Sequence, residues 1–261
     1  MKEKKGFGGF WKKLSGSREL SLVAVLVLLC AVIQLRNNTF LTAKTIADLL
    51  KNYSTTITIS LGMMSVLLIG GIDISVGATL AFSGMCASLM MRDGVYSSTL
   101  VMFLVSIAIG TLCGMLVGLI IAKGGVQPII ATLGMCNIYR GATYIVSNSA
   151  WVSAYQFQSS FKEFAQTNTL TGGLMNNLVF ITLVCYIVFF VVMKWTTFGR
   201  RIYAVGSNPE AANVSGVNVF WTTVMVHTLA GAMYGVTGFI EGARISSITQ
   251  SAGLNYECDA I

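Results

Sequence analysis

Long apolar segments separated by short polar ones dominate this sequence. A helix needs about 20 mainly apolar residues to cross the hydrocarbon core of a bilayer, where its backbone must satisfy its own hydrogen bonds. Several segments approach this length, so the pattern predicts an all-α fold, a polytopic transmembrane helix bundle with about seven spans. The expected spans are Leu20 to Leu35, Thr55 to Gly70, Ser75 to Met91, Leu100 to Ala122, Pro128 to Val146, Leu178 to Met193 and Trp221 to Ile240.

Composition agrees with a membrane protein. Of the 261 residues, 54% are hydrophobic and 10% are charged, whereas a soluble domain of this length intersperses far more charge. A basic start before an apolar run is also typical of a signal peptide. The end of the first span, Ala31 to Arg36, offers no convincing small-x-small cleavage site, so we expect a retained helix.

The basic residues predict the orientation of the chain. With the N-terminus in the cytoplasm, 10 of the 17 Lys and Arg residues lie on the cytoplasmic side. We therefore expect residues 1–19 to form a basic cytoplasmic N-terminus and residues 20–261 to form the transmembrane domain. The net charge of +7 is explained by this topology and by anionic lipid, so we expect membrane lipid and not nucleic acid as a partner.

Neither a metal site nor catalytic residues are indicated. Five of the six cysteines lie in apolar spans without a CxxC pair, as expected of buried small side chains. The sequence holds no GxxxxGK[ST] phosphate loop and no spacing typical of a nucleophile with its base, so we do not expect an enzyme.

Two features inside the spans predict packing. Gly110, Gly114 and Gly118 recur every four residues, which favours close contact between two helices. His227 lies in an apolar helix, where an interhelical hydrogen bond is a simpler interpretation than a proton relay.

The segment from Gly70 to Gly77 breaks the apolar pattern with Gly70, Gly71, Asp73, Ser75 and Gly77. One interpretation is a tight turn at the membrane surface, with Asp73 or Ser75 capping the next helix. The other is a break inside the bundle that takes part in the solute path, because irregular backbone at membrane depth must be buried in protein or line a cavity.

A polar stretch near residues 195–219 separates the last two spans. It contains Glu210-Ala211-Ala212 followed by Gly216, an EAAxxxG pattern. An ordinary surface helix capped by Ser207 or Asn208, with Glu210 in its first turn, is the structural interpretation of this pattern.

Four elements in the same order resemble the permease subunits of bacterial ATP-binding-cassette (ABC) importers for ribose and related monosaccharides. Residues 70–77 read GGIDISVG, similar to the GGIDLSVG of that family, and residues 127–134 are similar to its PxFIATLG element. Residues 199–212 resemble the segment that runs through the family's coupling loop, and residues 253–261 resemble its GxGYELDAI. The family continues beyond the last element with further helices, so we expect this chain to be truncated at its C-terminus.

The resemblance implies a subunit that moves sugar across the bacterial cytoplasmic (inner) membrane and binds no cofactor itself. A separate ATPase subunit would use ATP and Mg, an extracytoplasmic sugar-binding protein would deliver the solute, and a second permease copy or paralogue would complete the path. The residues implied to form the ATPase-coupling loop are Arg200, Arg201, Glu210, Ala211, Ala212 and Gly216.

Polar side chains in one span are candidates for the sugar path, because sugar recognition needs hydrogen-bonding groups and an aromatic face. They are Asn137, Tyr139, Arg140 and Tyr144. A structural arginine, snorkelling or paired with an Asp, is the alternative for Arg140. Glu241 and Arg244, near the outer end of a span, would contact the binding protein or be solvated.

Two other functions stay open on the sequence alone. An inactive truncated remnant fits the early stop, and an ion-coupled secondary transporter would need a buried acid, for which Asp73 is the candidate. The sequence does not indicate which sugar is carried.

Overall fold

The computed structural model describes residues 18–168, 170 and 175–261. The described residues divide into two compact units, the first ending at Leu49 and the second beginning at Leu50. The first unit holds α2 (Arg18–Arg36) and the start of α3 (Ala43–Leu68). Gln34 closes the turn between them, since its side chain accepts a hydrogen bond from Leu41 N at 2.8 Å and donates one to Asn38 O at 3.2 Å. The predicted basic N-terminus, residues 1–19, lies almost wholly outside the described residues.

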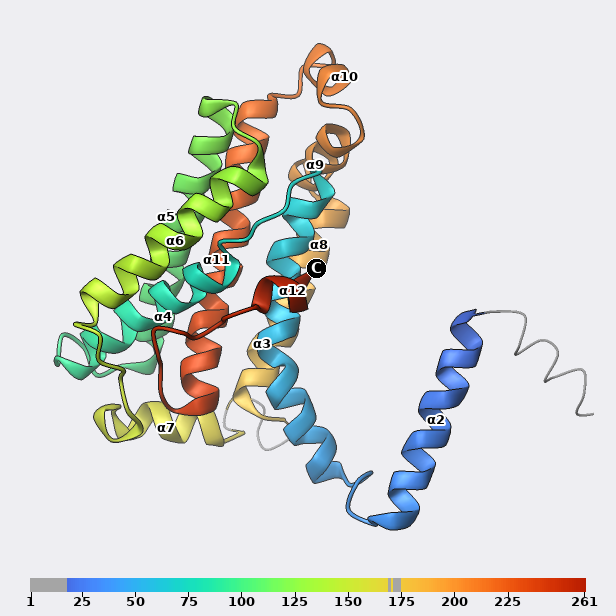
Figure 1. Ribbon diagram of the computed structural model, residues 1–261, viewed down its shortest axis with the longest axis vertical. Helices are drawn as coiled ribbons and strands as arrows, with labels where there is room; N and C mark the ends of the chain where they lie inside the picture. The colour runs from blue at the N-terminus through green and yellow to red at the C-terminus, as the bar shows by residue number, and fades with distance from the viewer. Residues whose placement is uncertain (1–17, 169, 171–174) are drawn as a thin grey trace, which may run out of the picture. The chain divides into compact units, whose positions relative to one another are not determined.

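The second unit contains the rest of α3 and all later helices (Figure 1). The helices α9 and α10 lie at one end of this unit, together with the N-terminal end of α11, and α7 lies at the opposite end. The elements are α4 (Val76–Arg92), α5 (Thr99–Gly124), α6 (Pro128–Val146), η1 (Ala154–Gln156), α7 (Ser159–Gln166), α8 (Asn177–Trp195), α9 (Thr197–Ser207), α10 (Pro209–Val214), α11 (Val219–Ile245) and α12 (Tyr256–Ala260).

Each of the seven predicted spans falls on a helix, and the all-α prediction is confirmed. By length and composition, three of the described helices are clearly able to cross a membrane, namely α5, α8 and α11. The apolar part of α2 and the whole of α4 are shorter. The helix α3 begins 12 residues before the expected start at Thr55, because Lys44, Asp48 and Lys51 interrupt the apolar residues of its first turns.

The helix α11 lies at the centre of the second unit, against α4 and α5. The glycines of α5 make this contact close: a Cβ on Gly110 would lie 2.7 Å from Gly235 Cα, and one on Gly118 would lie 2.9 Å from Val224 Cα. Ser106 Oγ also donates a hydrogen bond to Gly235 O at 2.8 Å. The predicted small-residue face of α5 is thus confirmed.

His227 faces this contact, but not with the expected interhelical hydrogen bond. Its Nδ1 lies 2.9 Å from Thr223 O of its own helix, and its buried Nε2 has no partner among the described residues. The close approach of α5 explains the difference, because glycines offer no side-chain group with which the imidazole can pair.

Candidate functional site

The polar stretch near residues 195–219 folds as two short helices, each with a capped start. Thr196 Oγ1 accepts a hydrogen bond from Gly199 N at 3.2 Å before α9, and Asn208 Oδ1 accepts one from Ala211 N at 3.0 Å before α10. Pro209 occupies the first turn of α10, where no backbone donor is needed, and Glu210 follows it. Of the two caps that the sequence left open, the structure uses Asn208.

The residues of the EAAxxxG pattern take different positions. Glu210 and Ala211 are exposed, whereas Ala212 is buried at 5% exposure and packs inward. Gly216 has φ +83°, and this left-handed conformation ends α10 as Val217 N donates to Ala212 O at 2.9 Å. Sequence reasoning missed Val214, whose side chain is 90% exposed on the same element. The sequence signal that could have identified Val214 is an apolar residue within an otherwise polar loop.

The helix α9 joins this exposed element to the membrane-spanning helices. Arg200 and Arg201 point outward, while Ile202 and Val205 are buried. A Cβ added to Gly206 would overlap the carbonyl oxygen of Leu68, the last residue of α3. The end of α9 therefore lies directly on the backbone that leads into residues 70–77.

The turn at residues 70–77 is held by local and distant hydrogen bonds. Asp73 is buried, and its Oδ1 accepts from Ser75 N at 2.9 Å and from Ser75 Oγ at 2.6 Å. Thr132 Oγ1 accepts a hydrogen bond from Ile74 N at 3.1 Å and donates one to Ile72 O at 3.2 Å. This turn is therefore fixed to α6, although α4 and α5 lie between them in the chain.

Two glycines of the turn have specific roles. Gly70 has φ +78°, which a residue with a side chain rarely adopts. A Cβ on Gly77 would overlap Gly253 O, so the first turn of α4 and the segment after α11 touch through their backbones. The motifs at residues 70–77 and 253–261, far apart in sequence, meet at this point.

The segment after α11 folds back along the second unit. Val152 and Ile248 form a pair of backbone hydrogen bonds, each 3.0 Å, and the chain then passes Arg140 before it reaches Gly77. Arg140 Nη1 donates to Gln250 O at 2.6 Å and to Ala252 O at 2.8 Å. The guanidinium thus satisfies carbonyls of an irregular segment that has no helical partner for them.

The four path candidates on α6 do not converge on one cavity. Tyr139 is buried and donates to Cys113 O at 2.7 Å, so it is committed to packing as Arg140 is. Asn137 is exposed, with its Nδ2 donating to Leu133 O of its own helix, and Tyr144 is 45% exposed. The alternative of a structural arginine describes Arg140 well, except that its partners are carbonyls and not an Asp.

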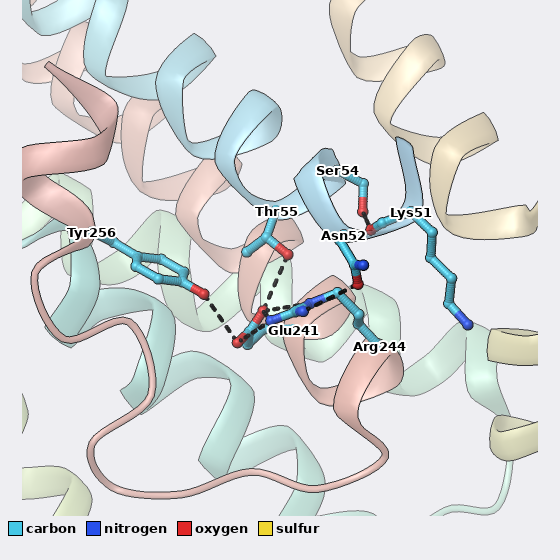
Figure 2. A network of polar contacts seen from close by, with 7 residues as sticks. All are labelled: Lys51, Asn52, Ser54, Thr55, Glu241, Arg244 and Tyr256. Atoms are coloured by element: carbon cyan, nitrogen blue, oxygen red, sulfur yellow. Dashed lines mark hydrogen bonds and ion pairs between the residues drawn. The ribbon is translucent and has the colours of Figure 1, made fainter. Parts of the chain in front are cut away.

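A buried carboxylate near the end of α11 joins three helices (Figure 2). Glu241 is 4% exposed and accepts from Thr55 Oγ1 of α3 at 3.1 Å and from Tyr256 Oη of α12 at 3.1 Å. Arg244 pairs with this carboxylate: its Nη2 lies 2.9 Å from Glu241 Oε1, and its Nε donates to Glu241 Oε2 at 3.2 Å. The Nη1 of Arg244 donates to Asn52 Oδ1 at 3.5 Å. The expectation of a solvated or partner-facing Glu241 is therefore wrong.

Sequence reasoning overlooked the network because its partners are far apart in the chain. The available signal was a lone acid with an Arg three residues later at the end of a long apolar helix. An acid in such a segment is costly unless paired and commonly marks a functional position.

Comparison with known proteins identifies the family. The family described as the permease component of branched-chain amino acid transport systems matches residues 45–261. This chain belongs to that family. The helices α9 and α10, the turn at residues 70–77, the folded-back segment and the Glu241 network all lie inside the matched part of the permease.

Curated relatives cover most of the permease. The galactose/methyl galactoside import permease protein of Escherichia coli (strain K12) is 33% identical over 256 residues, 94% of this chain and 76% of the relative. The ribose import permease protein of the same strain is 35% identical over 248 residues, 92% and 74% of the two chains. The ribose import permease protein of Bacillus subtilis (strain 168) is 34% identical over 236 residues, which are 90% of this chain and 72% of the relative. No solved structure matches the chain.

The permease is a membrane protein, as its family and its apolar helices show. The expected truncation at the C-terminus stays a prediction, and so do the individual roles of the site residues.

Proposed function

We propose that this chain is the membrane-spanning permease subunit of an ABC importer that carries a monosaccharide or a related small sugar. Its family supplies the transport class, and the relatives named as ribose and galactose permeases support the sugar. The observation that supports coupling to an ATPase is the exposed α10. Its first turn presents Glu210, and its last residue, Val214, is an apolar side chain that the permease itself leaves uncovered.

In this proposal α10 docks on a partner ATPase. Removing an exposed Val side chain from water is favourable, and the negative Glu210 near the positive end of α10 keeps that helix in place. The ATPase binds ATP and Mg, since the chain holds no phosphate loop of its own. Binding of ATP then biases the permease between two conformations.

The contact between α9 and α3 gives the movement a route into the membrane. Because Gly206 touches the backbone of Leu68 without an intervening side chain, a shift of α9 displaces the start of residues 70–77 directly. That turn is tied to α6 through Thr132 and to the folded-back segment through Gly77. We infer that these contacts move together as inward and outward access alternate.

Two permease copies, or this chain and a paralogue, form the solute path in this proposal. Asn137 and Tyr144 are exposed on α6 of the single chain and are available to line a path between copies. Tyr139 and Arg140 support the wall behind them. An extracytoplasmic sugar-binding protein delivers the solute at the end of the unit where α7 lies, while the N-terminus is cytoplasmic.

Co-purification with the partner ATPase that this proposal requires tests the coupling. The permease is expressed with the ATPase, extracted in detergent and captured through a tag, and the ATPase that remains bound is quantified. Val214→Ala and Glu210→Ala are expected to reduce the bound ATPase several-fold. Glu163→Ala, an exposed acid on α7 at the opposite end, is the matched control and is expected to leave it unchanged.

Each result bears on the proposal. Loss with the α10 variants alone supports it. Equal retention of the ATPase by all variants contradicts docking through α10, and no retention by the well-folded wild type contradicts the ABC assignment itself.

A further inference from the structure

A groove lies on the second unit where α3, α8 and α9 meet, at the end that carries α10. Its volume is about 420 Å³. Leu61, Phe189 and Met193 form its buried floor, so its inner surface is apolar. Phe190 and Tyr186 line its sides and are 44% and 52% exposed, which leaves the groove open along the surface of a membrane helix.

Two cations stand at one end of this groove, Lys194 and Arg200. The Nζ of Lys194 lies 5.2 Å from the ring centroid of Phe190 and 5.9 Å from that of Trp195, so the aromatic pair holds the ammonium over the groove. Both cations are exposed, and Tyr203 lines the groove beside them.

Among the described residues that line the groove, none carries a carboxylate. The sequence from Asn177 to Ser207 contains no Asp or Glu. In the described part of the chain, the ion pairs are formed by Arg92 and Arg244, both elsewhere. The groove therefore combines an apolar channel with unneutralised positive charge at its mouth.

We propose that this groove binds one anionic phospholipid, with its phosphate between Lys194 and Arg200 and an acyl chain along Phe189 and Met193. The position supports this ligand: α8 is one of the clearest membrane spans, and Lys194 with Trp195 mark the depth where headgroups lie. Basic pockets between membrane helices on the cytoplasmic side recognise anionic headgroups in this way.

A second copy of the chain is a poorer occupant. In a two-fold symmetric contact through this face, Lys194 and Arg200 of each copy would approach the same cations of the other. Like charges brought together out of water are unfavourable, whereas a lipid phosphate neutralises them. The site depends on α8 being a membrane span and not on which solute is carried, so its failure would leave the transport proposal intact.

Native mass spectrometry of the full purified chain tests the site. The chain is titrated with phosphatidylglycerol and, separately, with phosphatidylcholine of the same acyl chains. Each Lys or Arg near a headgroup contributes about fivefold to anionic-lipid affinity. K194Q/R200Q is therefore expected to weaken phosphatidylglycerol binding about 30-fold and to leave phosphatidylcholine binding unchanged.

Three further variants make the result specific. Lys123→Gln removes another exposed cation, at the end of α5, and is expected to change binding less than twofold. The charge-preserving K194R/R200K is expected to retain the preference, which separates charge from folding. Met64→Trp fills the groove without altering charge and is expected to reduce binding of both lipids.

Equal affinity of the wild type for the two lipids would overturn the proposal. So would a phosphatidylglycerol preference that survives K194Q/R200Q, or that falls equally with Lys123→Gln. A dimer in lipid-free detergent that the groove-filling Met64→Trp dissociates would assign the groove to a second copy instead.

Discussion

Replacing Gly114 by Ala is expected to destabilise the permease, although alanine favours a helix. A Cβ at this position would overlap His227 O and would lie 2.8 Å from Gly231 Cα, whereas ordinary van der Waals contacts of a Cβ begin at 3.4 Å. Both obstructing atoms belong to the backbone of α11 and cannot rotate away, so α5 and α11 must separate. Overpacking lowers the free energy of unfolding by about 1–3 kcal/mol, and because the obstructing atoms are rigid backbone we expect a cost of about 3 kcal/mol here.

The helix propensity of Ala offsets part of this cost. Ala is better than Gly inside a helix by about 0.5–1 kcal/mol, which leaves a net loss of about 2 kcal/mol. The free energy of unfolding is measured on the purified chain in detergent by denaturant titration. A loss of this size is well above the error of such a comparison between variants.

Gly141→Ala on α6 is the matched control, because it makes the same chemical change inside another helix. None of the residues that the structure describes lies within 4 Å of a Cβ at this position, so propensity alone is expected to stabilise the chain by about 0.5–1 kcal/mol. The two substitutions should therefore shift stability in opposite directions. If Gly114→Ala were neutral or stabilising, the account of the contact between α5 and α11 would be refuted.

Three other predictions follow from the contacts at the site. Arg140→Met leaves Gln250 O and Ala252 O without their donor, so we expect the free energy of unfolding to fall by about 3 kcal/mol and hydrogen exchange in residues 246–255 to become faster. Unchanged exchange in these residues would contradict the role given to Arg140. Glu241→Gln leaves the partly exposed Arg244 without its carboxylate and is expected to lower the free energy of unfolding in a denaturant titration by about 2 kcal/mol. The double variant E241Q/R244Q is expected to recover at least half of this loss, and no recovery would mean that the pair itself is unimportant. Gly206→Ala pushes α9 off Leu68 and is expected to abolish uptake while the ATPase still co-purifies, whereas normal uptake would exclude this contact as the coupling route.

The helices were largely predictable from the sequence, because each long apolar segment has one low-energy conformation in a membrane. The ends of the helices were harder to predict. The helix α3 starts at Ala43, in a stretch that mixes apolar with charged side chains, and the short α7 is too brief and too polar to give a signal of its own. The start of α10 was predicted, since Asn208 followed by Pro209 and Glu210 is a strong local sequence for beginning a helix.

The contacts of the site were predictable only where they are local. Asp73 and Ser75 are two residues apart and pair with each other. The sequence offered one of them as a side-chain cap of α4, and among the described residues no side chain caps the start of that helix. Thr55 and Glu241 are 186 residues apart, so no pattern along the chain indicates that they meet. Arg140 illustrates the same limit: its cost in a membrane was evident, but its partners are backbone carbonyls, which every residue carries.

Uptake of labelled sugar into proteoliposomes tests the central claim most directly. The permease is reconstituted with its ATPase and its sugar-binding protein, and ribose and galactose are supplied on the side of the binding protein. The account predicts uptake of a monosaccharide that requires ATP and is lost with Glu210→Ala combined with Gly216→Pro. Uptake driven by an ion gradient without ATP, or no uptake of any sugar by the fully assembled complex, would contradict it.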